Sequence, residues 1–170
     1  MAALGGLPKP IPSYDKLAAG YPKPQDYDAK KLGALIGGKV QSNLDGGVFT
    51  NTCSLRLSAA LNGAGVLLPR VAGSGNSSSG ADGNWYYPRL SVMQNFLTST
   101  WGVPTVISPA DYPKAIAGQT GVLIFQVQFS DASGHGTLWN GQSTIDNSDY
   151  SSRASQILFW PVPAAPNPNP

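Results

Sequence analysis

The chain has 170 residues, a formal net charge of +2 and a low share of charged residues, 12%. This length fits a single domain with a sizeable core, and the scattered basic residues do not form the positive patch of a nucleic-acid-binding domain. No apolar run is long enough to cross a membrane. One cysteine and one histidine make a poor zinc site, so we expect no metal. We likewise expect no cofactor, no nucleic-acid partner and no membrane span.

Prolines mark both ends of the chain: five lie in residues 1–24 and five in residues 161–170. Proline favours extended backbone and lacks the N–H group that helices and sheets use. We therefore expect proline-rich tails over residues 1–27 and 161–170, with one folded domain over residues 28–160. The N-terminal tail has no continuous apolar segment of the kind found in secretory signals, which predicts synthesis in the cytoplasm.

The first helix is expected to begin with Asp28 as its N-cap, because an aspartate side chain accepts hydrogen bonds from the free N–H groups of a first turn. Leu32, Leu35 and Ile36 then fall on one face, and Gly37-Gly38 ends the helix. Residues 40–49 are expected to form a loop or a short strand.

A second helix is expected over residues 53–62, with Asn51 or Thr52 as its cap. Apolar and small side chains recur on its inward face, at Cys53, Leu57, Ala60 and Leu61. Cys53 therefore lies in the first turn and faces the core. A third helix is expected over residues 90–100.

A polar, glycine-rich loop over residues 72–84 leads directly to Trp85. Two interpretations of Trp85 remain open at this point. The side chain is either an anchor of the core or the aromatic wall of a groove that the loop covers.

The second half of the chain is rich in strand-forming residues. Residues 121–129 predict a central strand, and a turn over residues 130–134 leads to a second strand over residues 135–140. Asn140-Gly141 predicts a hairpin turn, and a last strand is expected over residues 156–160. Helices followed by an antiparallel meander indicate the α+β class, with N-terminal helices packed on an antiparallel sheet.

Cys53 and His135 are the only cysteine and the only histidine. Each taken alone has an ordinary explanation, since a single cysteine is usually a small core residue and a single histidine is usually a surface residue. Together they favour catalysis: a thiol at a helix N-terminus is stabilised as the thiolate, and His135 opens a strand between two glycines that leave space around its ring. A lone cysteine with a distant histidine is typical of cysteine hydrolases.

Such a site needs two further groups. An acceptor must orient the second ring nitrogen of His135, and Asp146, Asn147 and Asp149 all follow the next turn. Donors must stabilise the oxyanion of the intermediate, and the free amides at the start of the Cys53 helix are expected to supply them, with the Asn51 side chain as a further donor.

Four segments resemble the type VI secretion amidase effectors of family 4, in order and with matching spacing across residues 30–160. They are residues 36–40 (IGGKV), 51–58 (NTCSLRLS), 81–86 (ADGNWY) and 134–139 (GHGTLW). The resemblance implies a papain-like fold of the NlpC/P60 type. It also implies secretion into a neighbouring bacterium, action in the periplasm of that cell, and cleavage of the γ-D-glutamyl to meso-diaminopimelate bond of peptidoglycan stem peptides.

By the same resemblance Cys53 is the nucleophile, His135 the base and Asp146 the orienting acid, and hydrolysis passes through an acyl-enzyme. The secretion machinery and a cognate immunity protein that protects the producing cell are the implied partners. We expect Asn51, Asn84, Trp85 and Trp139 to contribute the oxyanion and substrate contacts.

The stem peptide also carries carboxylates, for which Lys39, Arg56, Arg70 and Arg89 are the available cations. Two alternatives to the amidase remain open. One is an acyltransferase that uses the same cysteine and histidine. The other is a non-catalytic cell-wall binding module with Trp85, Trp101, Trp139 and the tyrosines as a sugar platform.

Overall fold

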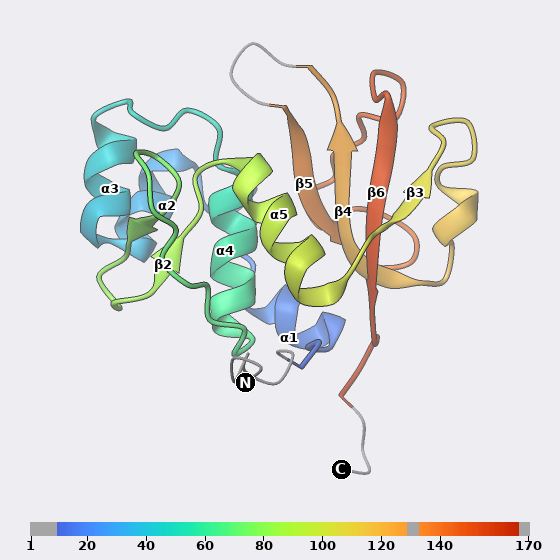
Figure 1. The fold of residues 1–170 in the computed structure, drawn as a ribbon, viewed down its shortest axis with the longest axis horizontal. Helices are drawn as coiled ribbons and strands as arrows, with labels where there is room; N and C mark the ends of the chain where they lie inside the picture. The colour runs from blue at the N-terminus through green and yellow to red at the C-terminus, as the bar shows by residue number, and fades with distance from the viewer. Residues whose placement is uncertain (1–9, 129–132, 167–170) are drawn as a thin grey trace, which may run out of the picture.

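The computed structural model describes residues 10–128 and 133–166 and has helices packed on one face of an antiparallel sheet (Figure 1). The helices are α1 (Tyr14–Ala19), α2 (Ala29–Ile36), α3 (Gly38–Asp45), α4 (Cys53–Gly63) and α5 (Leu90–Trp101), with a short 3₁₀ helix η1 (Lys114–Ile116). The strands are β1 (Ser78–Ser79), β2 (Trp85–Tyr86), β3 (Thr105–Ile107), β4 (Thr120–Gln126), β5 (Gly134–Trp139) and β6 (Gln156–Val162). The α+β prediction is confirmed.

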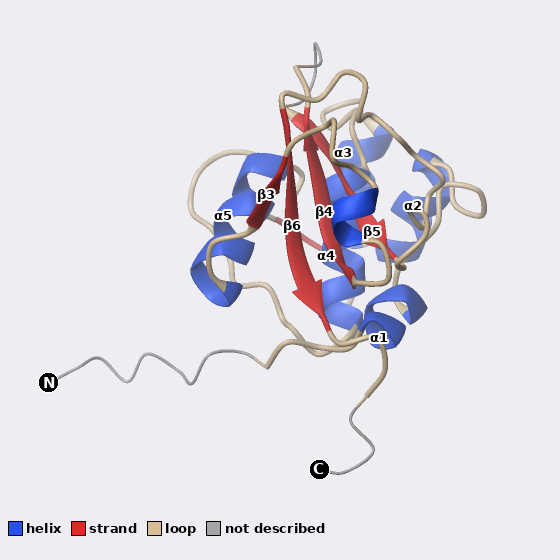
Figure 2. Ribbon diagram, turned by 90° about the vertical axis from the view of Figure 1, so that its right-hand side faces the viewer, coloured by secondary structure: helices blue, strands red, loops and turns tan. Residues whose placement is uncertain are grey.

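The main sheet has the strand order β3-β6-β4-β5, as Figure 2 shows from left to right, and every neighbouring pair is antiparallel. The predicted meander is wrong in one respect, because β6 lies between β3 and β4. The expected turn over residues 130–134, and Phe129 before it, fall largely outside the described residues. β5, which carries His135, is an edge strand.

Successive side chains of β4 point to opposite faces of the sheet, and both faces are covered. Ile124 packs in the main core with residues of α4 and α5, whereas Phe125 packs in a second cluster with Trp139 and Phe159. A strand buried on both faces reads as a continuous apolar run, which is the pattern that made β4 recognisable.

Helix α4 lies between the sheet and the α2–α3 pair. Its predicted inward face is confirmed, since four of its residues belong to the main core: Cys53, Leu57, Ala60 and Leu61. On its other side Leu55 packs with Leu32 and Ile36 of α2. The helix that begins with Cys53 is therefore held on both sides.

The predicted cap and end of α2 are confirmed, because the Asp28 side chain accepts a hydrogen bond from the Lys31 N–H (2.8 Å) and Gly37 follows the last residue. The predicted inward face is wrong at Leu35, which is 54% exposed, whereas Leu32 and Ile36 are buried. The prediction of a loop or strand over residues 40–49 is wrong, because α3 begins at Gly38. Gly38 has φ of 59° and approaches the Gly80 backbone so closely that a Cβ atom would lie 2.6 Å from it. The glycine pair thus reverses the chain and starts a new helix.

The predicted N-terminal tail does not describe residues 10–27. Helix α1 is capped by Ser13, and Leu17 is fully buried in the main core. The Tyr14 N–H donates to the Pro163 carbonyl (2.7 Å), so this segment is tied to the end of β6. The predicted C-terminal tail likewise begins inside β6, where Pro161 has a neighbouring strand on one side only, a place that tolerates proline.

Candidate active site

Cys53 and His135 are brought together at one end of the α4–β5 contact. Cys53 is the first residue of α4 and is 5% exposed, and the His135 side chain on β5 is 17% exposed. The Cys53 thiol interacts with the imidazole closely enough to raise the pKa of His135. The two side chains, 82 positions apart in the sequence, therefore form one site.

Asp146 completes this site. The His135 Nε2–H donates to Asp146 Oδ2 at 2.6 Å, and Asp146 Oδ1 accepts hydrogen bonds from the hydroxyls of Thr137 (2.8 Å) and Ser148 (2.6 Å). Because Nε2 faces the carboxylate, Nδ1 is the ring nitrogen left for the thiol. The alternatives are occupied elsewhere or exposed: Asp149 accepts the Ser151 N–H (2.9 Å), and Asn147 is exposed.

The turn after β5 returns Asp146 to His135. Asn140 Oδ1 accepts the N–H groups of Gln142 and Ser143, both at 2.9 Å, as expected for an Asn-Gly turn. The chain then runs back along β5, and the Ile145 N–H donates to the Leu138 carbonyl (2.9 Å). This return places Asp146 opposite His135, as the sequence predicted.

Hydrogen bonds outweigh burial in setting the pKa values of His135 and Asp146. Burial acts to lower the pKa of His135, but its hydrogen bond to Asp146 and its interaction with Cys53 raise the pKa to about 9. Burial acts to raise the pKa of Asp146, but hydrogen bonds from His135 and Ser148 hold it well below its usual range. At neutral pH the geometry therefore favours an imidazolium between a carboxylate and the sulfur, the partner that a thiolate nucleophile needs.

Tyr150 also contributes to this site. Its ring lies 5.0 Å from that of His135, between centroids, and 6.0 Å from that of Phe125. Sequence analysis missed Tyr150, Thr137 and Ser148. Thr137 alone had a visible signal, because it follows His135 by two positions and so shares its face of β5.

The arrangement of Cys53, His135 and Asp146 can now be compared with known proteins. A family model described as type VI secretion system (T6SS), amidase effector protein 4, Tae4, matches residues 49–160. The chain belongs to the Tae4 family. It is an antibacterial peptidoglycan amidase of the type VI secretion system.

Solved Tae4 structures are similar to this chain over nearly its whole length. The Tae4–Tai4 effector–immunity complex of Salmonella Typhimurium matches with a TM-score of 0.80 and 28% identity, covering 91% of this chain and 100% of that one. Tae4 of Enterobacter cloacae matches with a TM-score of 0.76 and 30% identity, covering 92% and 99%. The Enterobacter cloacae Tae4–Tai4 complex has a TM-score of 0.75 and 31% identity, covering 89% and 98%. No sequence among the curated proteins matches this chain.

In this Tae4 protein Asn51 lies beside Cys53. Its Oδ1 atom accepts the Cys53 N–H at 3.0 Å, which occupies one of the amides expected to serve the oxyanion. The Asn51 Nδ2 group then remains as a donor. Asn51 and Cys53 together line a small pocket of about 230 Å³, which also includes Arg89 at the start of α5.

The structure separates the predicted substrate residues. Trp85 is half-exposed and lines a larger pocket of about 860 Å³, which fits the groove-wall interpretation. The prediction for Trp139 is wrong, because it is buried in the second cluster and its indole N–H donates to the Ile116 carbonyl (3.1 Å). The Asn84 side chain donates to Asp82 (3.1 Å) within the β1–β2 turn and lines neither of these pockets.

These positions also remove the proposed sugar platform. Trp101 packs against the main core, Trp139 lies in the second cluster, and Trp85 lines the larger pocket. The three indoles therefore do not form one surface, which argues against a binding module built on them.

Arg56 is not available to a substrate. It is 5% exposed, and its Nη1 group donates to the carbonyls of Pro22 (2.9 Å) and Tyr27 (2.8 Å) while Nε donates to Thr52 (3.2 Å). Arg56 thus fastens the segment between α1 and α2 to the helix that carries Cys53. Of the four candidate cations, Lys39, Arg70 and Arg89 remain.

The glycine after His135 has a different role from the one expected. A Cβ atom at Gly136 would lie 2.8 Å from Leu57 and 2.9 Å from Leu90, so this glycine lets α4 and α5 approach β5 closely. It brings the thiol-bearing helix to the strand rather than clearing space around the imidazole.

Proposed function

We propose that this Tae4 protein cleaves the γ-D-glutamyl to meso-diaminopimelate bond of stem peptides with Cys53 as the nucleophile, His135 as the acid and base, and Asp146 as the orienting group. The observation that carries the proposal is that Asp146 is hydrogen-bonded to His135 and that the imidazole interacts with the Cys53 thiol at the N-terminus of α4. A papain-like relation of the NlpC/P60 type is part of the same proposal, since a cysteine-bearing helix lies against a histidine-bearing antiparallel sheet.

In the first half of the reaction, the Cys53 thiolate attacks the γ-carbonyl carbon of D-glutamate and a C–S bond forms. The carbonyl oxygen takes the negative charge. The His135 imidazolium then gives its proton to the departing nitrogen of diaminopimelate, the C–N bond breaks, and a thioester remains on Cys53.

Water completes the cycle. Neutral His135 takes a proton from a water molecule that attacks the thioester, the C–S bond breaks, and the γ-carboxyl of D-glutamate leaves. Asp146 keeps the proton on Nε2 throughout, so that Nδ1 serves the sulfur and then the water.

The oxyanion needs donors that are fixed before the reaction. We assign this role to the Asn51 Nδ2 group together with the first-turn amides of α4, whose N–H groups lack helical partners. The bond between Asn51 Oδ1 and the Cys53 N–H (3.0 Å) fixes the side chain beside the sulfur. Loss of one such donor costs a hydrolase about 3–4 kcal/mol of transition-state stabilisation.

We further propose that the protein is made in the cytoplasm, passes through the type VI machinery, and acts in the periplasm of the target cell. A cognate immunity protein follows from the same logic, because the producing cell has the same bond in its own wall. Support comes from the Salmonella Typhimurium and Enterobacter cloacae structures, which are complexes of Tae4 with Tai4. No helix among residues 10–128 and 133–166 is long and apolar enough to cross a membrane.

Digestion of purified sacculi tests the proposal. The native protein is expected to release fragments that end in D-glutamate and fragments that begin with free diaminopimelate, identified by mass. The Cys53→Ala variant is expected to release neither, while its circular dichroism and melting temperature match the native protein. Intact sacculi after treatment with folded native protein, or cutting at a different bond, would contradict the proposed function.

A further inference from the structure

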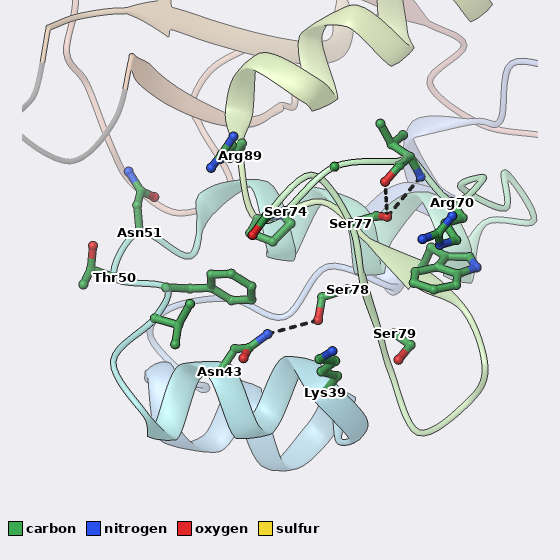
Figure 3. A pocket seen from close by; sticks show the side chains of 17 residues that line it. Lys39, Asn43, Thr50, Asn51, Arg70, Ser74, Ser77, Ser78, Ser79 and Arg89 are labelled. Carbon is green, nitrogen blue, oxygen red and sulfur yellow. Dashed lines mark hydrogen bonds between the residues drawn. The ribbon is translucent and has the colours of Figure 1, made fainter.

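The larger pocket, of about 860 Å³, lies beside the catalytic site and is walled by α3, the segment before α4, the loop that follows Leu68, and the start of α5 (Figure 3). We call it the cationic pocket. Three basic side chains line it from different sides: Lys39 from α3, Arg70 beside Trp85, and Arg89 at the start of α5.

Among residues 10–128 and 133–166, no acidic residue lines the cationic pocket. Within the part of the chain that the structure describes, the only ion pair is His135–Asp146, so Lys39, Arg70 and Arg89 have no carboxylate partner there. Their contacts are weak or neutral: Arg89 donates to the Asn76 side chain at 3.3 Å, and the Arg70 guanidinium lies 5.8 Å from the Trp85 ring centroid. Three positive charges around one concavity focus a field that attracts anions.

The remaining wall is polar. Ser74, Ser77 and Ser78 lie along it (Figure 3), and the Asn43 side chain donates to the Ser78 hydroxyl (3.4 Å). Such a surface suits a charged and hydrated ligand better than an apolar one.

The cationic pocket is continuous with the catalytic site. Asn51, Pro88 and Arg89 line both this pocket and the smaller pocket that contains Cys53. Since each extended residue of a peptide spans about 3.3–3.6 Å, a substrate whose scissile carbonyl is at Cys53 reaches Arg89 with its next groups.

We propose that the cationic pocket binds the free carboxylates of the peptide flanking the cleaved bond and thereby selects against peptides in which these carboxylates are amidated. This inference rests on the proposed function, because a γ-linked D-glutamate keeps its α-carboxylate and diaminopimelate keeps the carboxylate at the far end of its side chain. Arginine pairs with a carboxylate through two parallel hydrogen bonds, whereas a carboxamide of the same shape offers one acceptor and no charge.

The test measures binding without catalysis. Calorimetry is performed on the full-length Cys53→Ala protein with L-Ala-γ-D-Glu-meso-diaminopimelate and with the same tripeptide amidated at the α-carboxyl of D-glutamate and at the side-chain carboxyl of diaminopimelate. We expect the carboxylate form to bind at least tenfold more tightly. The variant Arg89→Gln, made in the same background, is expected to lose about tenfold or more of the affinity for the carboxylate form and to change that for the amidated form less than twofold.

Matched variants make the outcome decisive. Lys39→Gln and Arg70→Gln probe the other two cations, and Lys114→Gln removes an exposed charge that lines neither pocket. Arg89→Lys keeps the charge without the paired donors and is expected to retain part of the preference. Equal affinity of the two peptides, no measurable binding of either one, or equal losses for both peptides in all three pocket variants would overturn the inference.

This outcome is separable from that of the proposed function. Binding that depends on carboxylates and on Arg89 supports the cationic pocket even if sacculi remain uncut. Hydrolysis of both tripeptides at equal rates by the native protein would support the amidase chemistry while removing the role of the pocket.

Discussion

Charged side chains lie in two adjoining regions of this protein, the Cys53–His135–Asp146 site and the cationic pocket beside it. In the first, Asp146 is 3% exposed and accepts hydrogen bonds from His135, Thr137 and Ser148. In the second, Lys39, Arg70 and Arg89 lie around an open cavity without a carboxylate partner among the described residues. We expect charged groups that are hydrogen-bonded within the protein to fix the geometry of the reaction, and charged groups without such a partner to bind the substrate.

The largest expected effect on activity comes from the Cys53–His135–Asp146 site. His135→Ala removes both the proton donor and the partner of the thiolate, and kcat is expected to fall about 10⁴-fold or more. The rate of stem-peptide cleavage, followed by liquid chromatography, measures it. A residual rate within tenfold of the native enzyme would mean that another group serves as the base.

Buried and exposed arginines are expected to differ sharply in stability. Arg56→Met leaves the carbonyls of Pro22 and Tyr27 without their donor and should lower the free energy of unfolding by about 2–4 kcal/mol. Arg70→Gln in the cationic pocket should change it by less than about 0.5 kcal/mol. Urea unfolding of the two variants compares them directly. Equal losses in the free energy of unfolding would contradict the difference proposed between the two regions.

The raised pKa of His135 makes the stability of the protein depend on pH. A group whose pKa rises from 6.5 to about 9 on folding stabilises the protein below pH 6.5, and this stability is lost as the pH rises through 9. The loss expected is about 3 kcal/mol. Asp146, whose pKa is lowered, acts in the opposite sense and loses its contribution in acid. Urea unfolding at intervals across this range measures the loss, and His135→Gln should flatten the alkaline limb of the profile.

A smaller effect is expected at Thr137, which holds Asp146 in place through one hydrogen bond of 2.8 Å. Thr137→Val should reduce kcat about five- to tenfold and leave KM nearly constant. Thr137→Ser keeps the hydroxyl and should restore most of the rate. If Thr137→Ser were as slow as Thr137→Val, packing rather than the hydrogen bond would explain the loss.

The smallest effect is expected from salt. Raising the ionic strength from about 0.05 to about 0.3 M should increase KM severalfold, because exposed charges are screened, and should leave kcat unchanged, because buried pairs are screened little. Steady-state kinetics on a soluble stem peptide separate the two constants. A fall in kcat with constant KM would reverse the roles assigned to the two regions.

The sequence predicted the placement of Cys53, His135 and Asp146 in one site better than it predicted their surroundings. Cys53 and His135 stood out because they are unique and begin regular elements, and Asp146 followed from a turn that the structure confirms. The prediction that Trp139 contacts the substrate was wrong, although Trp139 shares a face of β5 with His135. The segment around η1 covers that part of the face, with the Tyr112 ring 5.4 Å from the indole, and local periodicity does not reveal such distant cover.

Two helices were missed for local reasons. Gly37 and Gly38 read as the end of one helix, and nothing nearby marks Gly38 as the start of the next, because its close approach to Gly80 is a long-range contact. α1 was missed because the prolines around it indicate an extended tail, whereas burial of Leu17 against α4 and the sheet provides the stability.

The pairing of Tyr14 with Pro163 has a consequence for handling and transport. It holds the first helix and the last strand together at the end of the molecule where Gly20 contacts Gly63, the last residue of α4, and therefore far from Cys53 at the opposite end of that helix (Figures 1 and 2). The described chain thus begins and ends on the side remote from the thiol, so a carrier protein that binds this side would leave the entrance to Cys53 open.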